Sequence, residues 1–377
     1  MNGSLKWIAL VGVVLVVGVV VWCRRASPPP IPGPVSGANP EAVAKQSGAR
    51  PVGALTATPE ALQSAASALV TAQTAAARVQ ALAHLRAALA TGNTNDTSAA
   101  IRRFLDSKLD AITGLAFKIG GHGSLTEAPT LRTFLLDQLE QLDPAAAAAY
   151  ARKVLNTSRS PDEWAVAFRN LARGDTGSEA RALLATKTAE LLRNESWQQD
   201  PSVGYLEAFD TAVYLGGTNL LSPLSDLVRK KDNPAVAHAA FLTLDRLAIN
   251  QPAETLAALS RHPEWMSGRE ETCANYFARA DVGDAAQRQL VEAYLLNTSR
   301  TPAELQSFAG VFPNANFMIS KNLLTDNATL DGTMLRQRDR TSLEVVTQWL
   351  ADPRFEQVRQ PLTTIQQRLQ EFTRQAK

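Results

Sequence analysis

The side chains best suited to chemistry in this sequence of 377 residues are its histidines, of which there are four. They are His84, His122, His238 and His262, and no two of them have the i, i+4 spacing with a glutamate that a helical zinc site requires. His122 stands in the one glycine-rich patch, Gly120-Gly121-His122-Gly123. Such a patch is typical of a break between helices. The alternative is a flexible loop that presents His122 to a ligand, so His122 is kept as a candidate interaction residue.

The sequence contains no other motif that is typical of a catalytic, metal or phosphate site. Its two cysteines, Cys23 and Cys273, form no metal-binding cluster, and we expect Cys273 to pack as a small apolar residue. No glycine-rich loop is followed by the lysine of a phosphate site, and no nucleophile motif supports a Ser-His-Asp or Cys-His arrangement. The formal net charge of +2 does not indicate the strongly basic surface that is typical of nucleic-acid binding. We therefore expect no catalytic residue, no cofactor, no metal and no nucleic-acid partner.

A repeated segment places two arginines at equivalent positions. Residues 155–163 read LNTSRSPDE and residues 296–304 read LNTSRTPAE. In each copy a helix is expected to end near the asparagine, and a capping box of Ser or Thr with Glu three residues later begins the next helix. One interpretation is a recurring turn, which explains every residue type except arginine. The other is a duplicated ligand loop in which Arg159 and Arg300 bind an anion.

Tryptophans form the remaining set of candidate interaction residues. Trp164 and Trp265 lie on or beside expected helices, as do Trp197 and Trp349. These rings are expected to pack in the core or between helices. The alternative is a binding surface, because large rigid rings dominate the energetics of many interfaces.

The segments that carry these residues are predicted to be helices. Helix-start signals recur in which a capping side chain precedes proline, and apolar residues then follow at helical spacing. The signals are Thr58-Pro59, Asp143-Pro144, Ser160-Pro161, Asn233-Pro234, Thr301-Pro302 and Asp352-Pro353. A first long helix is expected to carry Leu62, Leu69, Val79, Leu82, Leu85 and Leu89 on its apolar positions. Alternating strand patterns are nearly absent, so the sequence predicts an all-α fold of helical hairpins.

One stretch resembles the second half of a HEAT repeat. Residues 232–247 read DNPAVAHAAFLTLDRL, and Val236, Ala240, Leu244 and Leu247 fall on one helical face. Small alanines on that helix let neighbouring helices approach closely. The arginine that HEAT repeats often carry after the valine is Ala237 here. The resemblance implies a HEAT-like α-solenoid, the architecture in which stacked helix pairs offer an extended binding surface.

The N-terminal part of the sequence predicts a membrane anchor. Residues 7–23, after a tail at 1–6, read WIALVGVVLVVGVVVWC without a charge. About 17–25 apolar residues suffice to cross a bilayer, and tryptophans favour its interfaces. A cleaved signal is the alternative, but no small-residue cleavage site follows directly. Residues 24–58 are rich in proline, glycine and serine and predict an extended linker to a helical domain at 59–377.

These features predict a single-pass protein of a bacterial cytoplasmic membrane that acts as a scaffold for a protein partner. Lys6 on one side of the span nearly balances Arg24 and Arg25 on the other, so charge does not fix the orientation. An extracytoplasmic domain is expected, because a short tail before an anchor is a common export arrangement in bacteria. The alternative is a tethered enzyme or small-molecule-binding protein with its site in the helical array.

Overall fold

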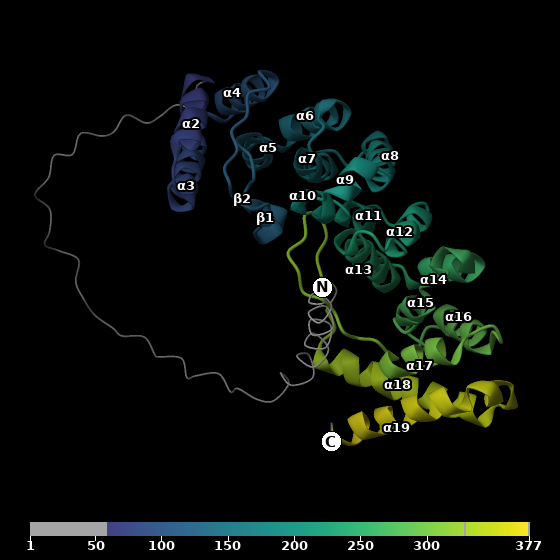
Figure 1. Cartoon of the computed structure of the whole chain (residues 1–377). Coiled ribbons are helices and arrows are strands. Elements are labelled where there is room, and N and C mark those ends of the chain that lie inside the picture. Colours follow the sequence, from purple (N-terminus) through teal and green to yellow (C-terminus); the bar gives the residue numbers. More distant parts are fainter. Residues whose placement is uncertain (1–58, 328, 376–377) are drawn as a thin grey trace, which may run out of the picture. The chain divides into compact units, whose positions relative to one another are not determined.

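The computed structural model describes residues 59–327 and 329–375, all of which belong to one unit, Gly53–Lys377. These residues are mainly helical, as the sequence predicts (Figure 1). The tail, the expected anchor at residues 7–23 and the linker at 24–58 lie outside the described residues. Within the described part, every helix is too short or too polar to cross a bilayer.

The chain begins with a helical hairpin where the sequence predicts one long helix. Helix α2 (Pro59–Thr71) ends before Thr74, whose hydroxyl caps α3 (Ala75–Thr91) by accepting from the Ala77 amide at 3.1 Å. Val79, expected on the apolar face, is 46% exposed. The prediction of a single helix is wrong because the Thr74 cap starts a new helix, which turns Val79 outward. Helix α4 (Thr94–Asp106) then packs on α2 and on α5.

The helices after α4 form two rows, each following the order of the chain (Figure 1). Neighbours in the first row, which we call the inner row, contact one another directly. It consists of α5 (Leu131–Leu142), α7 (Pro161–Gly174), α10 (Val203–Glu207), α11 (Asp210–Leu215), α13 (Pro234–Asn250), α15 (Glu270–Phe277) and α17 (Pro302–Val311).

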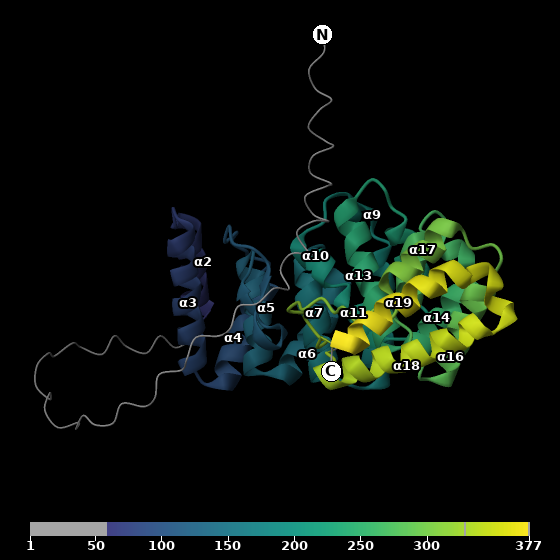
Figure 2. The ribbon, with the colours of Figure 1, turned by 90° about the horizontal axis from the view of Figure 1, so that it is seen from below.

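The second row packs behind the first. It consists of α6 (Pro144–Thr157), α8 (Ser178–Leu192), α12 (Leu221–Val228), α14 (Pro252–Arg261) and α16 (Ala285–Leu296). Short helices α9 (Glu195–Gln199) and η2 (Pro263–Met266) connect α8 and α14 to the next helices of the inner row, and η3 (Pro353–Val358) packs on α16. A final hairpin of α18 (Gly332–Ala351) and α19 (Arg359–Gln375) packs on α17 (Figure 2).

Helix caps are confirmed at four of the six predicted starts; Thr58 lies outside the described residues, and Asp352 caps the short helix η3 by accepting from the Arg354 amide. Asp143, Ser160, Asn233 and Thr301 each accept a bond from the backbone amide three residues later, and proline follows each of them. The reciprocal bond of the capping box does not form in either copy, because both glutamates are engaged elsewhere. Glu163 pairs with Arg132 at 2.6 Å, and Glu304 accepts from the Tyr294 hydroxyl at 2.8 Å.

Removing a cap hydroxyl should destabilise the domain. Ser160→Ala and Thr301→Ala each remove an acceptor, at 3.3 Å and 3.1 Å from the amide it serves. We expect each change to cost about 0.5–2 kcal/mol, measured by urea unfolding followed by helical circular dichroism. Ser64→Ala, on the exposed face of α2, is the matched control and should leave the midpoint almost unchanged. Midpoints equal to the wild-type value in both cap variants would show that these hydroxyls do not hold the helices.

The apolar face predicted for residues 232–247 is confirmed in α13. Val236, Ala240, Leu244 and Leu247 are each at most 1% exposed, and they join one apolar cluster that includes helices of both rows. His238 is exposed on the opposite side of the helix. This geometry is what stacked helices require in general, so the HEAT-like assignment stays a prediction.

A two-stranded hairpin between α4 and α5 is not predicted by the sequence. Strands β1 (Lys118–Ile119) and β2 (Leu125–Glu127) pair antiparallel around the short helix η1 (Gly121–Gly123). They are too short to show an alternating pattern. Their position depends on a buried ion pair between Arg169 and Asp137, which bind the backbone of Gly123 and Leu125 respectively. The predicted break between helices at the glycine patch is therefore confirmed, in the form of a hairpin.

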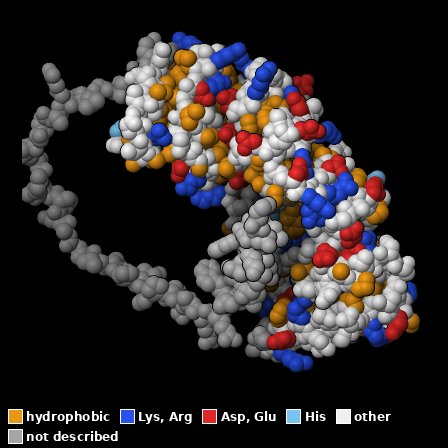
Figure 3. All heavy atoms as spheres, in the orientation of Figure 1, with side chains coloured by type: hydrophobic (Ala, Val, Ile, Leu, Met, Phe, Trp, Pro, Cys, Tyr) orange, Lys and Arg blue, Asp and Glu red, His pale blue; other side chains and the backbone are white. Residues whose placement is uncertain are grey.

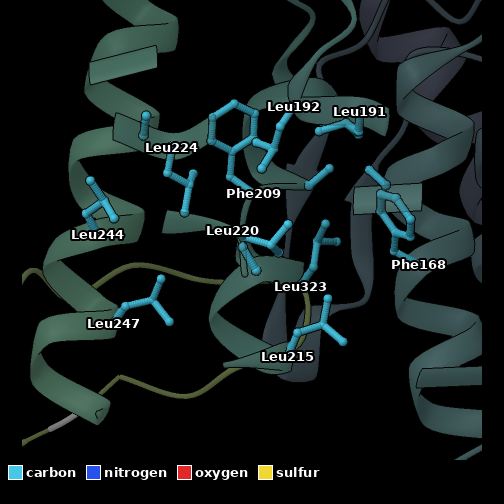
Figure 4. Packing of buried hydrophobic residues seen from close by; sticks show 14 of the residues in the cluster. Phe168, Leu191, Leu192, Phe209, Leu215, Leu220, Leu224, Leu244, Leu247 and Leu323 are labelled. Atoms are coloured by element: carbon cyan, nitrogen blue, oxygen red, sulfur yellow. The ribbon is translucent and has the colours of Figure 1, made fainter. Parts of the chain in front are cut away.

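After α17 the chain runs back along the inner row before it enters α18 (Figures 1 and 2). We call residues 312–327 the return segment. Its Leu323 is 1% exposed and lies among Leu215, Leu220 and Phe168 (Figure 4). A residue more than 100 positions away from these partners thus completes their core. Gly123 has φ +64° and lies so close to Leu323 that a Cβ would overlap the Leu323 carbonyl, so this contact needs glycine.

Candidate binding groove

A groove of about 370 Å³ lies between the return segment, α10, α11 and α13. Apolar side chains supply much of its surface, among them Leu206, Leu242 and Ile249 from the helices and Phe317 and Met318 from the return segment. The α13 residues that line it repeat at helical spacing on the face of the helix away from its buried stripe. The return segment is one wall of the groove, so whatever holds the segment also forms the site.

Asp210, the first residue of α11, holds the segment near its C-terminal end. Its carboxylate accepts from the backbone amides of Leu324 at 2.7 Å and Thr325 at 3.0 Å, and also from the Thr325 hydroxyl. Arg246 of α13 donates to the same carboxylate at 2.8 Å and to the Thr325 hydroxyl. The Asp210 side chain is only 4% exposed, so these charge-assisted bonds form away from water.

Arg279 of α15 holds the segment near its beginning. Its guanidinium makes two bonds to Asp245, at 2.8 Å and 2.7 Å, and donates to the backbone carbonyls of Asn314 and Asn316. Burial raises the pKa of the Asp245 carboxyl, and the bond from Arg279 opposes that rise. The planar guanidinium suits this task because it can serve a carboxylate and a backbone turn together.

Two carboxylates of the groove are left without such partners. Among residues 59–327 and 329–375, neither Glu207 of α10 nor Asp326 of the return segment has a hydrogen-bond or ion-pair partner, although both line the groove. Burial raises the pKa of the Glu207 carboxyl, and the nearby Asp210 charge raises it further against the opposing effect of Arg246. The groove thus combines apolar walls with unpaired negative charge.

His122 lies beside the return segment, at a hollow separate from the groove. It is exposed, with φ 51°, and its backbone carbonyl accepts from Arg173 at 2.5 Å. The same guanidinium reaches the Leu323 carbonyl at 3.2 Å. A hollow of about 300 Å³ there is lined by Gly121, His122 and Arg173 together with residues of the return segment. The imidazole has no bonded partner within the described chain, so His122 stays a candidate interaction residue only.

The two arginines of the duplicated segment differ in their surroundings. Arg159 is exposed, whereas Arg300 donates to the buried Glu304 at 2.8 Å and lies over the Tyr294 ring at 4.3 Å. Arg300 therefore has a structural partner that its counterpart lacks. The two copies share their helix cap but not the surroundings of their arginines, and anion binding at Arg159 and Arg300 stays a hypothesis. Arg300 also borders a separate hollow of about 580 Å³ between α17 and α19.

The two candidate tryptophans pack as inter-helix wedges. Trp164 is 4% exposed, donates its ring N–H to the Ser158 carbonyl at 3.1 Å and packs edge-on against Trp197 at 5.1 Å. Trp265 is half-buried and stacks on His262 at 4.3 Å. The expectation of packing rather than a binding surface is confirmed for Trp164, while Trp265 keeps one exposed side.

Cys273 is buried, as the sequence predicts, and burial raises the pKa of its thiol to about 12. Such a thiol is packed rather than reactive. In the part of the chain that the structure describes, no group of three or more His, Cys, Asp or Glu side chains could hold a metal ion.

Sequence reasoning missed the residues that build the groove. Asp210, Arg246 and Arg279 belong to no motif, and their partners lie many residues away. The only signal for them in the sequence is that Asp245 and Arg246 stand together between the apolar positions Leu244 and Leu247 of the HEAT-like stretch. No protein family, curated protein or solved structure compared with this chain matches it.

Proposed function

We propose that this chain is a membrane-anchored helical scaffold that binds another protein in the groove beside the return segment. The observation that carries the proposal is the apolar groove itself, because its lining includes the exposed side chain of Met318. Met318 is 58% exposed, and the next residue in the chain, Ile319, is 82% exposed but is not one of the lining residues. Exposed apolar surface of this kind at the edge of a groove marks an interaction site. On the face seen in Figure 3, basic and acidic side chains are interspersed, so charge alone marks no binding surface there.

The membrane part of the proposal comes from the sequence of residues 7–23, followed by the linker at 24–58. Anchoring would raise the local concentration of the groove near a membrane partner. The two-row stacking of helices is the arrangement that a HEAT-like solenoid would have, and solenoids commonly bind partners along one row. We propose that the helical domain lies outside the cytoplasm, because a short tail before an anchor is a common export arrangement in bacteria.

A second candidate function is a tethered enzyme or small-molecule-binding protein. The raised pKa of Glu207 in a concave site favours it, because catalytic acids and bases often show such shifts. Protein binding ranks first because the groove is open along its rim and the described lining residues include no cysteine nucleophile or metal cluster beside Glu207.

A photo-cross-linker placed in the groove tests the proposal. A benzoylphenylalanine at Met318 in the full-length chain should give one discrete protein adduct in native membranes. The same group at Val79, which is 46% exposed on α3, is the matched control and should give none. An adduct from neither position, or the same adducts from both, would contradict a protein partner in the groove. Fractionation of the full-length chain with the soluble proteins would contradict the anchor separately.

A further inference from the structure

We propose that the groove receives a lysine or arginine side chain of the partner protein, with Glu207 as its ion-pair acceptor and apolar residues on both sides. This inference rests on the proposed function and names the chemistry of the occupant. The groove would then bind a short segment of the partner protein in which a basic residue stands between apolar residues. No residue of the described chain has this role at present.

The distribution of charge in the groove supports a cationic occupant. Asp210 is paired with Arg246, and Asp245 is paired with Arg279. Glu207 and Asp326 remain, one from the helical wall and one from the return segment. Arg246 is already bonded to Asp210 and Thr325, so its charge acts on Glu207 without forming an ion pair with it. An acidic side chain would be repelled, whereas a basic one would complete the pairing.

The apolar walls suit the stem of a basic side chain. Lysine and arginine bury their methylene chains along apolar surface while the charged end reaches a polar group. Leu206 and Leu242 line the groove on the helical side, and Phe317 and Met318 line it on the side of the return segment. The Phe317 ring already faces a guanidinium, that of Arg279, at 5.8 Å. Apolar residues that flank the basic one would contact Met318, which lines the groove and is exposed.

The state of Glu207 adds a physical reason for binding. Burial and the Asp210 charge raise the pKa of this carboxyl, and the Arg246 charge offsets that rise only in part, so its ionised form lacks a full counter-charge in the free protein. A bound ammonium or guanidinium would supply the missing counter-charge. Because Glu207 lies partly away from water, the attraction would be screened less by salt than that of a surface pair.

Peptide binding to the full-length chain in detergent micelles tests the inference. The probes are acetylated and amidated seven-residue peptides with leucine, valine and phenylalanine around a central lysine, arginine, norleucine, glutamine or glutamate. Fluorescence anisotropy should give about tenfold or more tighter binding for lysine or arginine than for norleucine, as expected for a hydrogen bond to a charged group. Glu207→Gln should abolish this advantage. Glu344→Gln, an exposed carboxylate on α18, is the matched control and should preserve it.

Glu207→Gln should keep the wild-type Tm, because the carboxylate has no bonded partner in the described chain to lose. Asp326→Asn, at an exposed residue of the return segment, is the second variant and should reduce the advantage in part. Equal binding of lysine and norleucine peptides, a preference for glutamate, no binding at all, or an unchanged advantage in Glu207→Gln would each overturn the inference. If Met318 still cross-links to a protein, the scaffold function survives such a failure. An adduct with a second copy of this chain would instead assign the groove to self-association and overturn the inference.

Discussion

Arg169→Met is expected to lower the free energy of unfolding by about 3–5 kcal/mol, the usual cost of leaving one member of a buried ion pair without its partner. The side chains of Arg169 and Asp137 are both 0% exposed and lie 2.5 Å apart. Arg169 also donates to the Gly123 carbonyl at 2.7 Å, and Asp137 accepts from the Leu125 amide at 2.8 Å. The change would therefore loosen the β1–β2 hairpin and the α5–α7 contact together.

Urea unfolding of the full-length chain measures this effect. Arg359→Met, at an ion pair whose side chains are 51% and 67% exposed, is the control and should barely move the midpoint. Combining Arg169→Met with Asp137→Leu removes both charges, so the double variant should lose less than the two single losses added together. Strictly additive losses, or an Arg169→Met midpoint equal to that of wild type, would mean that the pair does not hold the hairpin.

Asp210→Ala is expected to release the return segment and remove one wall of the groove. The carboxylate accepts bonds from two amides and the hydroxyl of Leu324 and Thr325, and another from Arg246. Bonds to a charged group contribute about 1.5–3 kcal/mol each and are not additive, so we expect local opening to become easier by about 2–4 kcal/mol. That corresponds to at least about thirtyfold faster amide exchange in residues 320–327.

Hydrogen–deuterium exchange with mass spectrometry measures this change in the exchange rate of residues 320–327 directly. Asp326→Ala alters the neighbouring exposed carboxylate, which has no bonded partner in the described chain, and should leave exchange in the same peptide nearly unchanged. Peptides from α16 should exchange as in wild type in both variants, because α16 lies outside the groove. Equal protection of residues 320–327 in Asp210→Ala and wild type would show that other contacts hold the segment.

The sequence predicted the local structure well because local rules govern it. Caps such as Asn233 and Thr301 act within three residues, and the stripe from Val236 to Leu247 follows helical periodicity. The split between α2 and α3 was missed, since alanine-rich sequence continues across it and only Thr74 signals the new start. The hairpin at 118–127 was missed because its strands are too short to show a pattern.

The candidate groove depends on long-range pairing that no local pattern encodes. Asp210 meets Thr325 across more than 100 residues of chain, and Arg173 reaches Leu323 across 150. Of the residues chosen from sequence, His122 lies beside the return segment, whereas Trp164 packs in the core. The duplicated segment does not give its two arginines the same surroundings, since Arg159 is exposed while Arg300 is paired with Glu304.

The most direct test of the scaffold proposal is cross-linking from Met318 in native membranes, with the groove either open or blocked. Ala235 lines the groove and is exposed, so Ala235→Trp should block it without disturbing the core. Ala182→Trp places the same side chain on the exposed face of α8, outside the groove. We expect a protein adduct that persists in Ala182→Trp and is lost in Ala235→Trp at unchanged Tm. An adduct of equal yield in both variants would contradict binding in the groove.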